Sequence, residues 1–371
     1  MTQPQDLRSR ELREANVVSQ GIERNEGQAI GQVRDGEVVS IGRDSFRCSS
    51  GGVIYLIGSG STAPPGRDAR SERLIPPLLP YLADRNDQEY VLKQAVQEKL
   101  TQNPTRPLLC FIHGDENQAH DAFLDRLCQV SLPRLLKSLS VGLDVAVKTR
   151  HIVWPSGGKH PQQLHERLRT ELANAIADDS LASIEYVNQT LADFPGPVVM
   201  HTHLNTEDWE RPNSKTLLPA LIDFWQNWPD LLGGRLVLVC ACIGYQREQH
   251  WNGFGEWILR PFSTLRRFLK CRRYRKLNGK IRTQLKTLVP TQCTRLTAVV
   301  LPELEDLTQS HVQDWARSDD TATFIKRAEL EKERLLGEIQ RMFEEWEKQT
   351  ASDKMSMREV GDRLAGFLKQ L

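Results

Sequence analysis

Short apolar runs that alternate with amphipathic stretches constrain the fold of this chain more than any other feature. Each run has the length of a strand and is bounded by Gly, Pro or polar residues, whereas the stretches between the runs have the apolar spacing of helices. The expected strands cover residues 107–113, 143–153, 197–204, 235–244 and 296–301, and the expected helices cover 87–100, 119–137, 161–177, 184–192 and 214–227. Strands that alternate with helices form a parallel sheet covered on both faces, so the sequence predicts the α/β class.

The composition changes along the chain in a way that predicts three segments. Residues 1–73 are predicted to be an N-terminal extension with short strands and a linker, because they carry alternating runs punctuated by glycine. Residues 74–310 are the predicted α/β domain. Residues 311–371 end in a highly charged stretch with helical spacing of its apolar side chains, which predicts a C-terminal helical unit.

Charge and apolar length exclude several classes of protein. The 371 residues contain 49 Lys and Arg against 48 Asp and Glu, a formal net charge of +1, which excludes a globally basic nucleic-acid binder and a globally acidic tail protein. No apolar run approaches the length of a membrane-spanning helix, and the first residues lack the apolar core of a secretory signal. Seven thinly spread cysteines are typical of reduced, buried thiols, so a cytoplasmic protein is expected.

A strand, a glycine, a polar turn and a helix follow one another over residues 108–124, in the order of a phosphate-binding loop. In a working loop, backbone amides hold the phosphates, a second glycine and a Lys follow, and a Ser or Thr hydroxyl binds Mg²⁺. Here four residues separate Gly114 from Ala119, His120 and Asp121, so the second glycine, the Lys and the hydroxyl are all missing. Carboxylates in and beside the turn would also repel a triphosphate. The sequence therefore predicts a degenerate loop that does not bind nucleotide.

The acidic residue that holds Mg²⁺ in such enzymes is missing as well. It would end a later apolar strand, where this chain has His201, Thr202 and His203. The following strand ends with Cys240 and Cys242, where a polar sensor residue would be expected. Loss of these positions in a chain that keeps the strand pattern predicts a domain without catalytic activity.

The residues around the degenerate loop are similar to those of a known family. The blocks are IPPLLPYLADR at 75–85 followed by Gln88 and Glu89, PLLCFIHGDE at 107–116, and VSLPRL at 130–135. They resemble the inactive STAND domains of bacterial conflict and signalling systems, which are similar to the STAND NTPase switches but lack the Walker motifs. The resemblance covers roughly residues 74–371. It implies a P-loop NTPase-like fold and a role in signalling or antiphage defence beside an effector or effector-associated protein, and it carries over no catalytic residue.

Histidines and cysteines gather at the carboxyl ends of the predicted strands, where open α/β sheets bind ligands. His201 and His203 alternate onto one face of a strand, and with His113 and Cys242 they offer imidazole and thiolate, the ligands that zinc prefers. A zinc site is one interpretation. The other is that the histidines hydrogen-bond loop backbone in place of the lost phosphate machinery and that the chain needs no cofactor.

Eleven Lys and Arg residues crowd the stretch 260–286 of this otherwise neutral chain. The possible anion or partner patch consists of Arg266, Arg267, Arg272, Arg273, Arg275 and Lys276. Such a patch can hold the phosphates of a nucleic acid, anionic lipid head groups or an acidic partner protein. It can also be a solvated helix face.

Residues 27–61 carry glycine-spaced, β-branched segments outside the predicted core. An isolated pair of strands is marginally stable, so these segments must pack on the core, pair with another chain or stay loose. Self-association by strand pairing through residues 27–61 is therefore a hypothesis.

These observations favour a non-catalytic STAND-like regulatory or scaffold module that acts through a protein partner. Two other classes stay open: a nucleotide- or zinc-dependent hydrolase at the strand ends, and a nucleic-acid-binding module that uses the basic stretch. Metal content after purification tests for a zinc-dependent hydrolase, and the salt dependence of oligonucleotide binding tests the nucleic-acid module.

Overall fold

The chain forms two compact units, Met1–Leu74 and Ile75–Leu371. The computed structural model describes residues 38–41, 44–47, 78–139, 146–155, 161–210, 217–246, 261–293, 295–318, 321–322 and 332–369. In the first unit, strands β1 (Val38–Ile41) and β2 (Asp44–Arg47) pair antiparallel. The rest of the predicted self-association segment lies outside the described residues, so that hypothesis stays a prediction.

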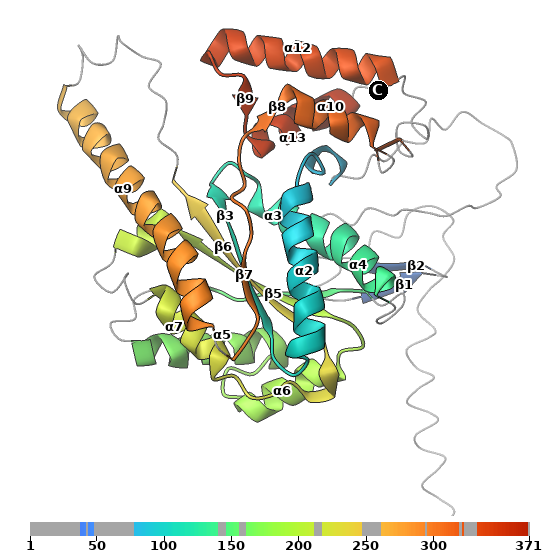
Figure 1. The fold of residues 1–371 in the computed structure, drawn as a ribbon, viewed down its shortest axis with the longest axis vertical. Helices are drawn as coiled ribbons and strands as arrows, with labels where there is room; N and C mark the ends of the chain where they lie inside the picture. Colours follow the sequence, from blue (N-terminus) through green and yellow to red (C-terminus); the bar gives the residue numbers. More distant parts are fainter. Residues whose placement is uncertain are drawn as a thin grey trace, which may run out of the picture. The chain divides into compact units, whose positions relative to one another are not determined.

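A five-stranded sheet forms the centre of the second unit, in the order β4–β5–β6–β3–β7 (Figure 1). Its strands are β3 (Leu108–Asp115), β4 (Lys148–His151), β5 (Val198–Asn205), β6 (Val237–Tyr245) and β7 (Ala298–Val300). Every pairing between these strands is parallel, which confirms the predicted α/β class. The predicted strand 143–153 is realised only as the four residues of β4, at the edge of the sheet.

The three inner strands are apolar on both faces because helices cover both faces. Alternate residues of β3 belong to different cores, so that Cys110 lies in one and Phe111 in the other. The register places Cys110 beside Cys240, and His203 beside Cys242. The parallel register therefore brings the carboxyl ends of β3, β5 and β6 to one edge of the sheet.

Two sets of helices cover the two faces (Figure 1). One face is covered by α2 (Asn86–Gln102), α3 (His120–Arg126), the π-helical turn η2 (Leu127–Ser131) and α4 (Leu132–Ser138). The other face is covered by α5 (Pro161–Ala177), α6 (Ile184–Asp193), α7 (Leu217–Gln226) and α9 (Pro261–Gln292), with the 3₁₀ turns η3 (Thr206–Glu210) and η5 (Leu232–Gly234). The predicted helices correspond to α2, α5, α6 and α7, and the one expected over 119–137 runs through α3, η2 and α4.

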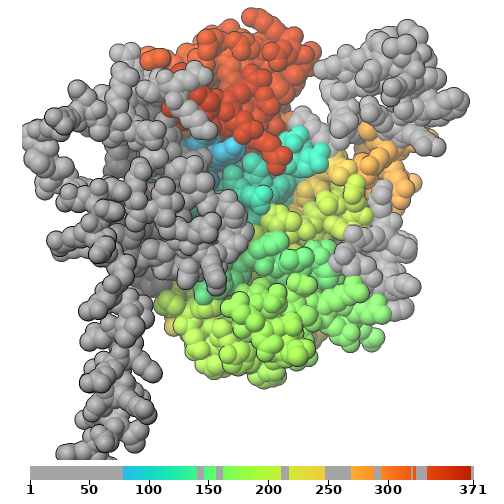
Figure 2. Space-filling view, turned by 180° about the vertical axis from the view of Figure 1, so that it is seen from behind, coloured from blue at the N-terminus to red at the C-terminus, as the bar shows by residue number. Residues whose placement is uncertain are grey.

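A third core joins the helices that follow the sheet. It contains α10 (Gln309–Arg317), α12 (Lys332–Thr350), α13 (Met357–Lys369) and the 3₁₀ turn η1 (Leu79–Tyr81). The short strands β8 (Leu307–Thr308) and β9 (Lys354–Met355) pair antiparallel at its base. Figure 2 shows these red C-terminal residues in contact with the blue and cyan segment that begins at η1. We call α10, α12 and α13 the helical cluster.

Cys110, Cys128, Cys240 and Cys242 are free and buried, as the sequence predicts for reduced thiols. Within the described residues, no helix combines the length and the apolarity that crossing a membrane requires.

Candidate functional site

The turn Asp115–Ala119 connects β3 to α3, where a phosphate-binding loop would lie. Three of its amides are already used within the chain. Glu116 N donates to Tyr245 O at 2.9 Å. Asn117 N donates to Asp115 Oδ1 at 3.0 Å, and Gln118 N donates to Asp115 O at 3.0 Å. A phosphate loop holds its ligand with amides of this kind, so a phosphate at this turn would have to displace three existing hydrogen bonds.

An extended segment, Leu301–Leu307, crosses the carboxyl end of β3, and we call it the strap. Leu304 N donates to His113 O at 2.8 Å, which continues the pairing of β7 with β3 beyond the end of β7. A Cβ on Gly114 would lie 2.7 Å from Leu304 Cβ and 2.8 Å from Leu304 O. The glycine that begins the degenerate loop is therefore required by close packing of the strap.

A buried polar network fastens the turn to the strap. The Arg85 guanidinium donates to Gln118 Oε1 at 3.0 Å, and Gln118 Nε2 donates to Asp306 Oδ1 at 2.6 Å. Arg85 and Gln118 are both buried, and burial lowers the pKa of Arg85 to about 10, which leaves it charged at neutral pH. A buried charge needs such partners, so the turn and the strap hold one another in place.

The helical cluster also contacts the turn. Arg358 N, at the start of α13, donates to Asn117 O at 3.0 Å. Ala119 stands where a working loop has its second glycine and lies in the core of the helical cluster. Its φ of 50° and ψ of 56° are in the left-handed region that favours glycine. The turn thus packs against the helices that follow the sheet.

A second cluster of polar side chains contacts the strap through Glu303. The Tyr245 hydroxyl bonds to His113 Nδ1 at 2.9 Å, and burial raises the pKa of Tyr245, so the phenol keeps its proton and donates. Glu303 accepts two hydrogen bonds from Arg282, at 2.7 and 2.5 Å. Burial lowers the pKa of His113. His113 is therefore a neutral acceptor inside this group.

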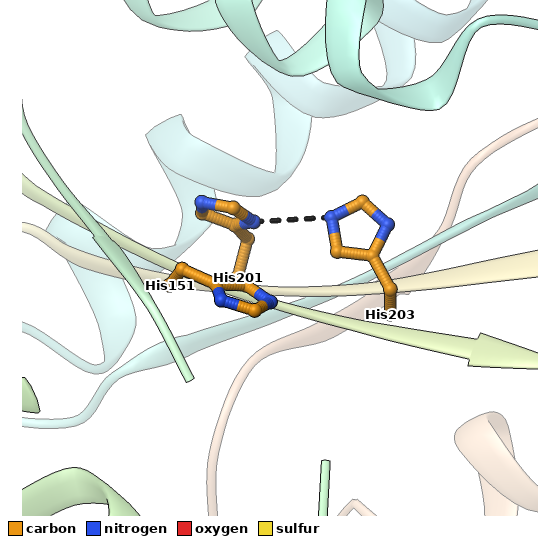
Figure 3. Close-up of side chains that lie close together, drawn as sticks. All are labelled: His151, His201 and His203. Carbon is orange, nitrogen blue, oxygen red and sulfur yellow. Dashed lines mark hydrogen bonds between the residues drawn. The ribbon is translucent and has the colours of Figure 1, made fainter. Parts of the chain in front are cut away.

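Histidines occupy the ends of the two strands farthest from β7. His201 and His203 lie on the face of β5 that α3 covers, and His151 lies beside His201 in the register of β4 with β5. Figure 3 shows the three rings side by side, with His201 Nδ1 hydrogen-bonded to His203 Nε2 at 3.2 Å. We call His151, His201 and His203 the histidine group. Thr202 points to the opposite face, where its buried hydroxyl has no hydrogen-bond partner among the described residues.

Burial and neighbouring imidazoles favour the neutral forms of His201 and His203. Burial first, and then His203 and His151, lower the pKa of His201 to about 4. Burial also lowers the pKa of His203, against the opposing effect of Asp121. The Oδ1 of Asp121, in the first turn of α3, lies 3.4 Å from His203 Nε2. The site therefore combines the neutral imidazoles of His201 and His203 with the ring of His151 and the carboxyl group of Asp121.

Two of the four predicted metal ligands, His113 and Cys242, do not belong to the histidine group. His113 bonds to Tyr245 on the other face of the sheet. Cys242 is the register neighbour of His203, but its thiol is buried in the apolar core and burial raises its pKa. His151 takes their place, although the sequence analysis did not select it. Its position at the end of the predicted strand 143–153 was the available signal, because neighbouring parallel strands end at one edge.

The basic stretch forms part of one helix, α9. Arg272, Arg273, Arg275 and Lys276 are exposed, whereas Tyr274 is buried and donates its hydroxyl to Glu207 Oε1 at 3.0 Å. The side chains of the other two predicted patch residues, Arg266 and Arg267, lie outside the described part of the chain. The exposed basic side chains therefore lie on a helix whose opposite side packs on the core.

One protein family matches part of this chain. A family model described as inactive STAND matches residues 80–243, which include the degenerate loop and most of β6. The matched residues make up less than half of the chain, and over that part the chain is similar to the inactive STAND family. The strap, β7 and the helical cluster follow the matched residues. No curated protein matches the sequence.

Solved structures match the chain at low similarity. ORC1 of Aeropyrum pernix in complex with DNA is 15% identical, with a TM-score of 0.36; the match covers 78% of this chain and 61% of that one. Drosophila ORC bound to DNA is 13% identical, with a TM-score of 0.29 and coverage of 85% and 70%. A RuvB mutant of Thermotoga maritima is 9% identical, with a TM-score of 0.27 and coverage of 76% and 70%. The chain thus spans less than two thirds of the first of these proteins.

Proposed function

We propose that this chain is a non-catalytic regulatory module of a bacterial signalling system, in which a STAND-like domain responds to a protein partner instead of a nucleotide. The observation that carries the proposal is the internal use of the three amides of Glu116, Asn117 and Gln118. In a nucleotide switch such amides hold the phosphates, whereas here they hold the turn.

Electrostatics at the turn supports the same conclusion. Asp115 and Glu116 are in the turn and Asp121 follows it on α3. Negative groups at contact distance repel strongly where water is scarce. At the end of β5, histidines stand where a carboxylate would hold Mg²⁺. Neither a phosphate nor its magnesium ion therefore finds an attractive site.

The turn keeps a mechanical role in this proposal. In a nucleotide switch, contacts made by the terminal phosphate bias a two-state element. Here the contacts of the turn with the strap and with α13 replace those of a ligand. A partner that binds one arrangement of the helical cluster better than another would shift its population in proportion to that difference in affinity.

The exposed face of α9 is the surface that we assign to the partner. Residues 261–292 contain ten Lys and Arg and neither Asp nor Glu. The chain as a whole has a net charge of only +1, so this helix is a local field of one sign. A protein with an acidic surface is complementary to it. The turn is less suited to this role, because Gly114, Gln118, Ala119 and His120 are buried.

Calorimetric titration with ATP and ADP, with and without Mg²⁺, tests the loss of nucleotide binding. We expect no binding heat from the full chain. A variant that restores the loop residues, Ala119→Gly with His120→Lys and Asp121→Thr, should also fail to bind, because the amides and the strap are unchanged. Micromolar binding by the unaltered chain would overturn the proposal, and binding by the restored variant alone would show that side chains, not the amides, block the site.

Charge reversal on α9 tests the partner surface. Arg272→Glu with Arg275→Glu should abolish binding of a purified acidic partner, whereas Arg317→Glu on α10, a matched control, should leave it unchanged. Titration with a double-stranded oligonucleotide at several salt concentrations is the competing arm. Tight binding that falls steeply with salt would assign the patch to nucleic acid and contradict the protein partner.

A further inference from the structure

Three imidazoles from neighbouring strands lie within reach of a single ion. His151 comes from the edge strand β4, and His201 and His203 come from β5 (Figure 3). Each can offer one ring nitrogen, and these nitrogens lie within 4.8 Å of one another. Zinc binds imidazole nitrogen at about 2.0–2.1 Å, so two ligands at a tetrahedral angle are separated by about 3.3 Å. The distance from His201 Nδ1 to His203 Nε2 is 3.2 Å.

Asp121, in the first turn of α3, offers a carboxylate as a fourth ligand. Asp121 Oδ1 lies 3.4 Å from His203 Nε2, and its side chain is 84% exposed, so it can turn toward an ion at low cost. Three imidazoles with one carboxylate are ligands that zinc and related divalent transition metals accept. We propose that His151, His201, His203 and Asp121 bind one such ion.

The contacts of the rings favour this role over a purely structural one. Histidines that replaced phosphate machinery would be expected to hydrogen-bond loop backbone. Among the described residues, the rings of the histidine group make no such bond: the His201–His203 hydrogen bond and the approach of Asp121 are their polar contacts. His201 and His203 are half-buried on a sheet face next to the buried Val199. Burying polar rings there lowers the stability of the fold unless the rings have further partners. A shared ion would satisfy them together.

The position of the ligands indicates what the ion would do. β4 is a four-residue strand that pairs, among the described strands, only with β5, so few backbone bonds hold it. An ion bound by His151 on β4, by two residues of β5 and by Asp121 on α3 would connect the edge strand, its neighbour and the covering helix. Four protein ligands leave no open position, which is typical of a structural ion.

Metal titration of the full chain tests the site directly. After treatment with a chelator, the protein is titrated with zinc chloride and with cobalt chloride, since Co²⁺ in a tetrahedral site absorbs visible light intensely. We expect one ion per chain. His151→Asn and His203→Asn should each weaken binding by at least about 100-fold, because even loss of a residue that only supports a metal ligand costs about 10–100-fold. Asp121→Asn should weaken it by at least about 10-fold.

A matched control and a second readout keep the result interpretable. His165→Asn alters a part-buried histidine on α5 outside the group and should leave the affinity unchanged. Zinc should raise the melting temperature of the unaltered chain and of His165→Asn, but not that of His151→Asn. Because His151 is exposed, its replacement should not prevent folding.

Several results would overturn the assignment. Absence of stoichiometric binding, or binding that His151→Asn and His203→Asn do not weaken, would refute the site. Binding unchanged by Asp121→Asn would refute the fourth ligand. These results are distinguishable from those of the nucleotide and partner tests. Asp121 is the one residue altered in both sets, and the nucleotide test is also made on the unaltered chain.

Discussion

Two regions at the same edge of one sheet differ in how far their polar groups are hydrogen-bonded within the chain. In the turn Asp115–Ala119, three successive amides and the buried Gln118 side chain all have partners within the chain. In the histidine group, the rings contact one another and Asp121. The first region has its hydrogen bonds made within the chain, whereas the second brings three ring nitrogens within 4.8 Å of one another.

This difference shows how a ligand site can be lost and another arrangement can arise beside it. The strap occupies the side of the sheet near β7 and supplies acceptors to the turn, through Asp306, and to Arg282, through Glu303. It does not reach the ends of β4 and β5. Polar residues there are left to a ligand or to solvent. The predictions below test the two regions against each other.

The largest effect is expected where the strap touches β3. Gly114→Ala would place a Cβ 2.7 Å from Leu304 Cβ and 2.8 Å from Leu304 O, so the backbone must shift. We expect the free energy of unfolding to fall by about 2–3 kcal/mol. Gly279→Ala, on the exposed side of α9 with open space around it, should instead raise it by up to about 1 kcal/mol. Equal effects in urea unfolding would show that the strap does not pack closely on Gly114.

A matched pair of polar substitutions compares the regions directly. Gln118→Met removes partners of Arg85 and Asp306 and should lower the free energy of unfolding by about 2 kcal/mol. In metal-free protein, His151→Asn should change it by less than about 0.5 kcal/mol, because the ring is exposed. Gln94→Met, an exposed site on α2, is the control for the side-chain change. A large effect of His151→Asn without metal would remove the distinction between the regions.

The pH dependence of the free energy of unfolding should show whether His113, buried beside the strap, is neutral in the folded chain. His113 has a lowered pKa because it is buried, although Glu303 opposes the shift and Arg282 and Lys286 add to it. Below the usual pKa of histidine, His113 is therefore protonated in the unfolded chain but stays neutral in the folded chain. Stability should fall as the pH drops below about 6.5 and continue to fall until the lowered pKa is reached.

Unfolding in urea at a series of pH values measures this effect. His113→Gln should reduce the loss of stability on acidification relative to the unaltered chain, whereas His165→Asn should retain more of it. An unchanged pH profile in His113→Gln would show that His113 is not a buried neutral acceptor.

The smallest effects concern backbone strain. Ala351 and Ala119 both have left-handed backbones, with φ of 55° and 50°. Ala351→Gly should raise the free energy of unfolding by about 1 kcal/mol, because the strain is relieved at an exposed site. Ala119→Gly should change it by roughly zero, since removing the buried methyl group costs about 0.8 kcal/mol. A clear gain from Ala119→Gly would mean that its side chain does not contribute to the core of the helical cluster.

The sheet could be predicted from the sequence because its buried strands are continuous apolar runs between turn residues. The loss of the loop residues at Ala119, His120 and Asp121 was visible for the same reason, since the order of strand, turn and helix fixes their positions. The strap could not be predicted. Its residues show no strand periodicity, and its contact with Gly114 depends on the pairing of distant segments.

The histidine group was predictable only in part. His201 and His203 have the two-residue spacing of one strand face, which the sequence shows directly. His113 was named as a possible zinc ligand with His201 and His203 because the sequence does not reveal which face of β3 it occupies relative to β5. His151 was missed because β4 is a short edge strand without apolar alternation. Both errors arise from the register between strands, which tertiary packing decides.

Amide hydrogen exchange at Glu116, Asn117 and Gln118 tests the central claim most directly. If these amides are bonded within the chain, they should exchange slowly in the nucleotide-free protein, and saturating ATP with Mg²⁺ should leave their rates unchanged. Fast exchange without nucleotide, followed by protection on addition of ATP, would show that the turn is an open phosphate loop and would contradict the account.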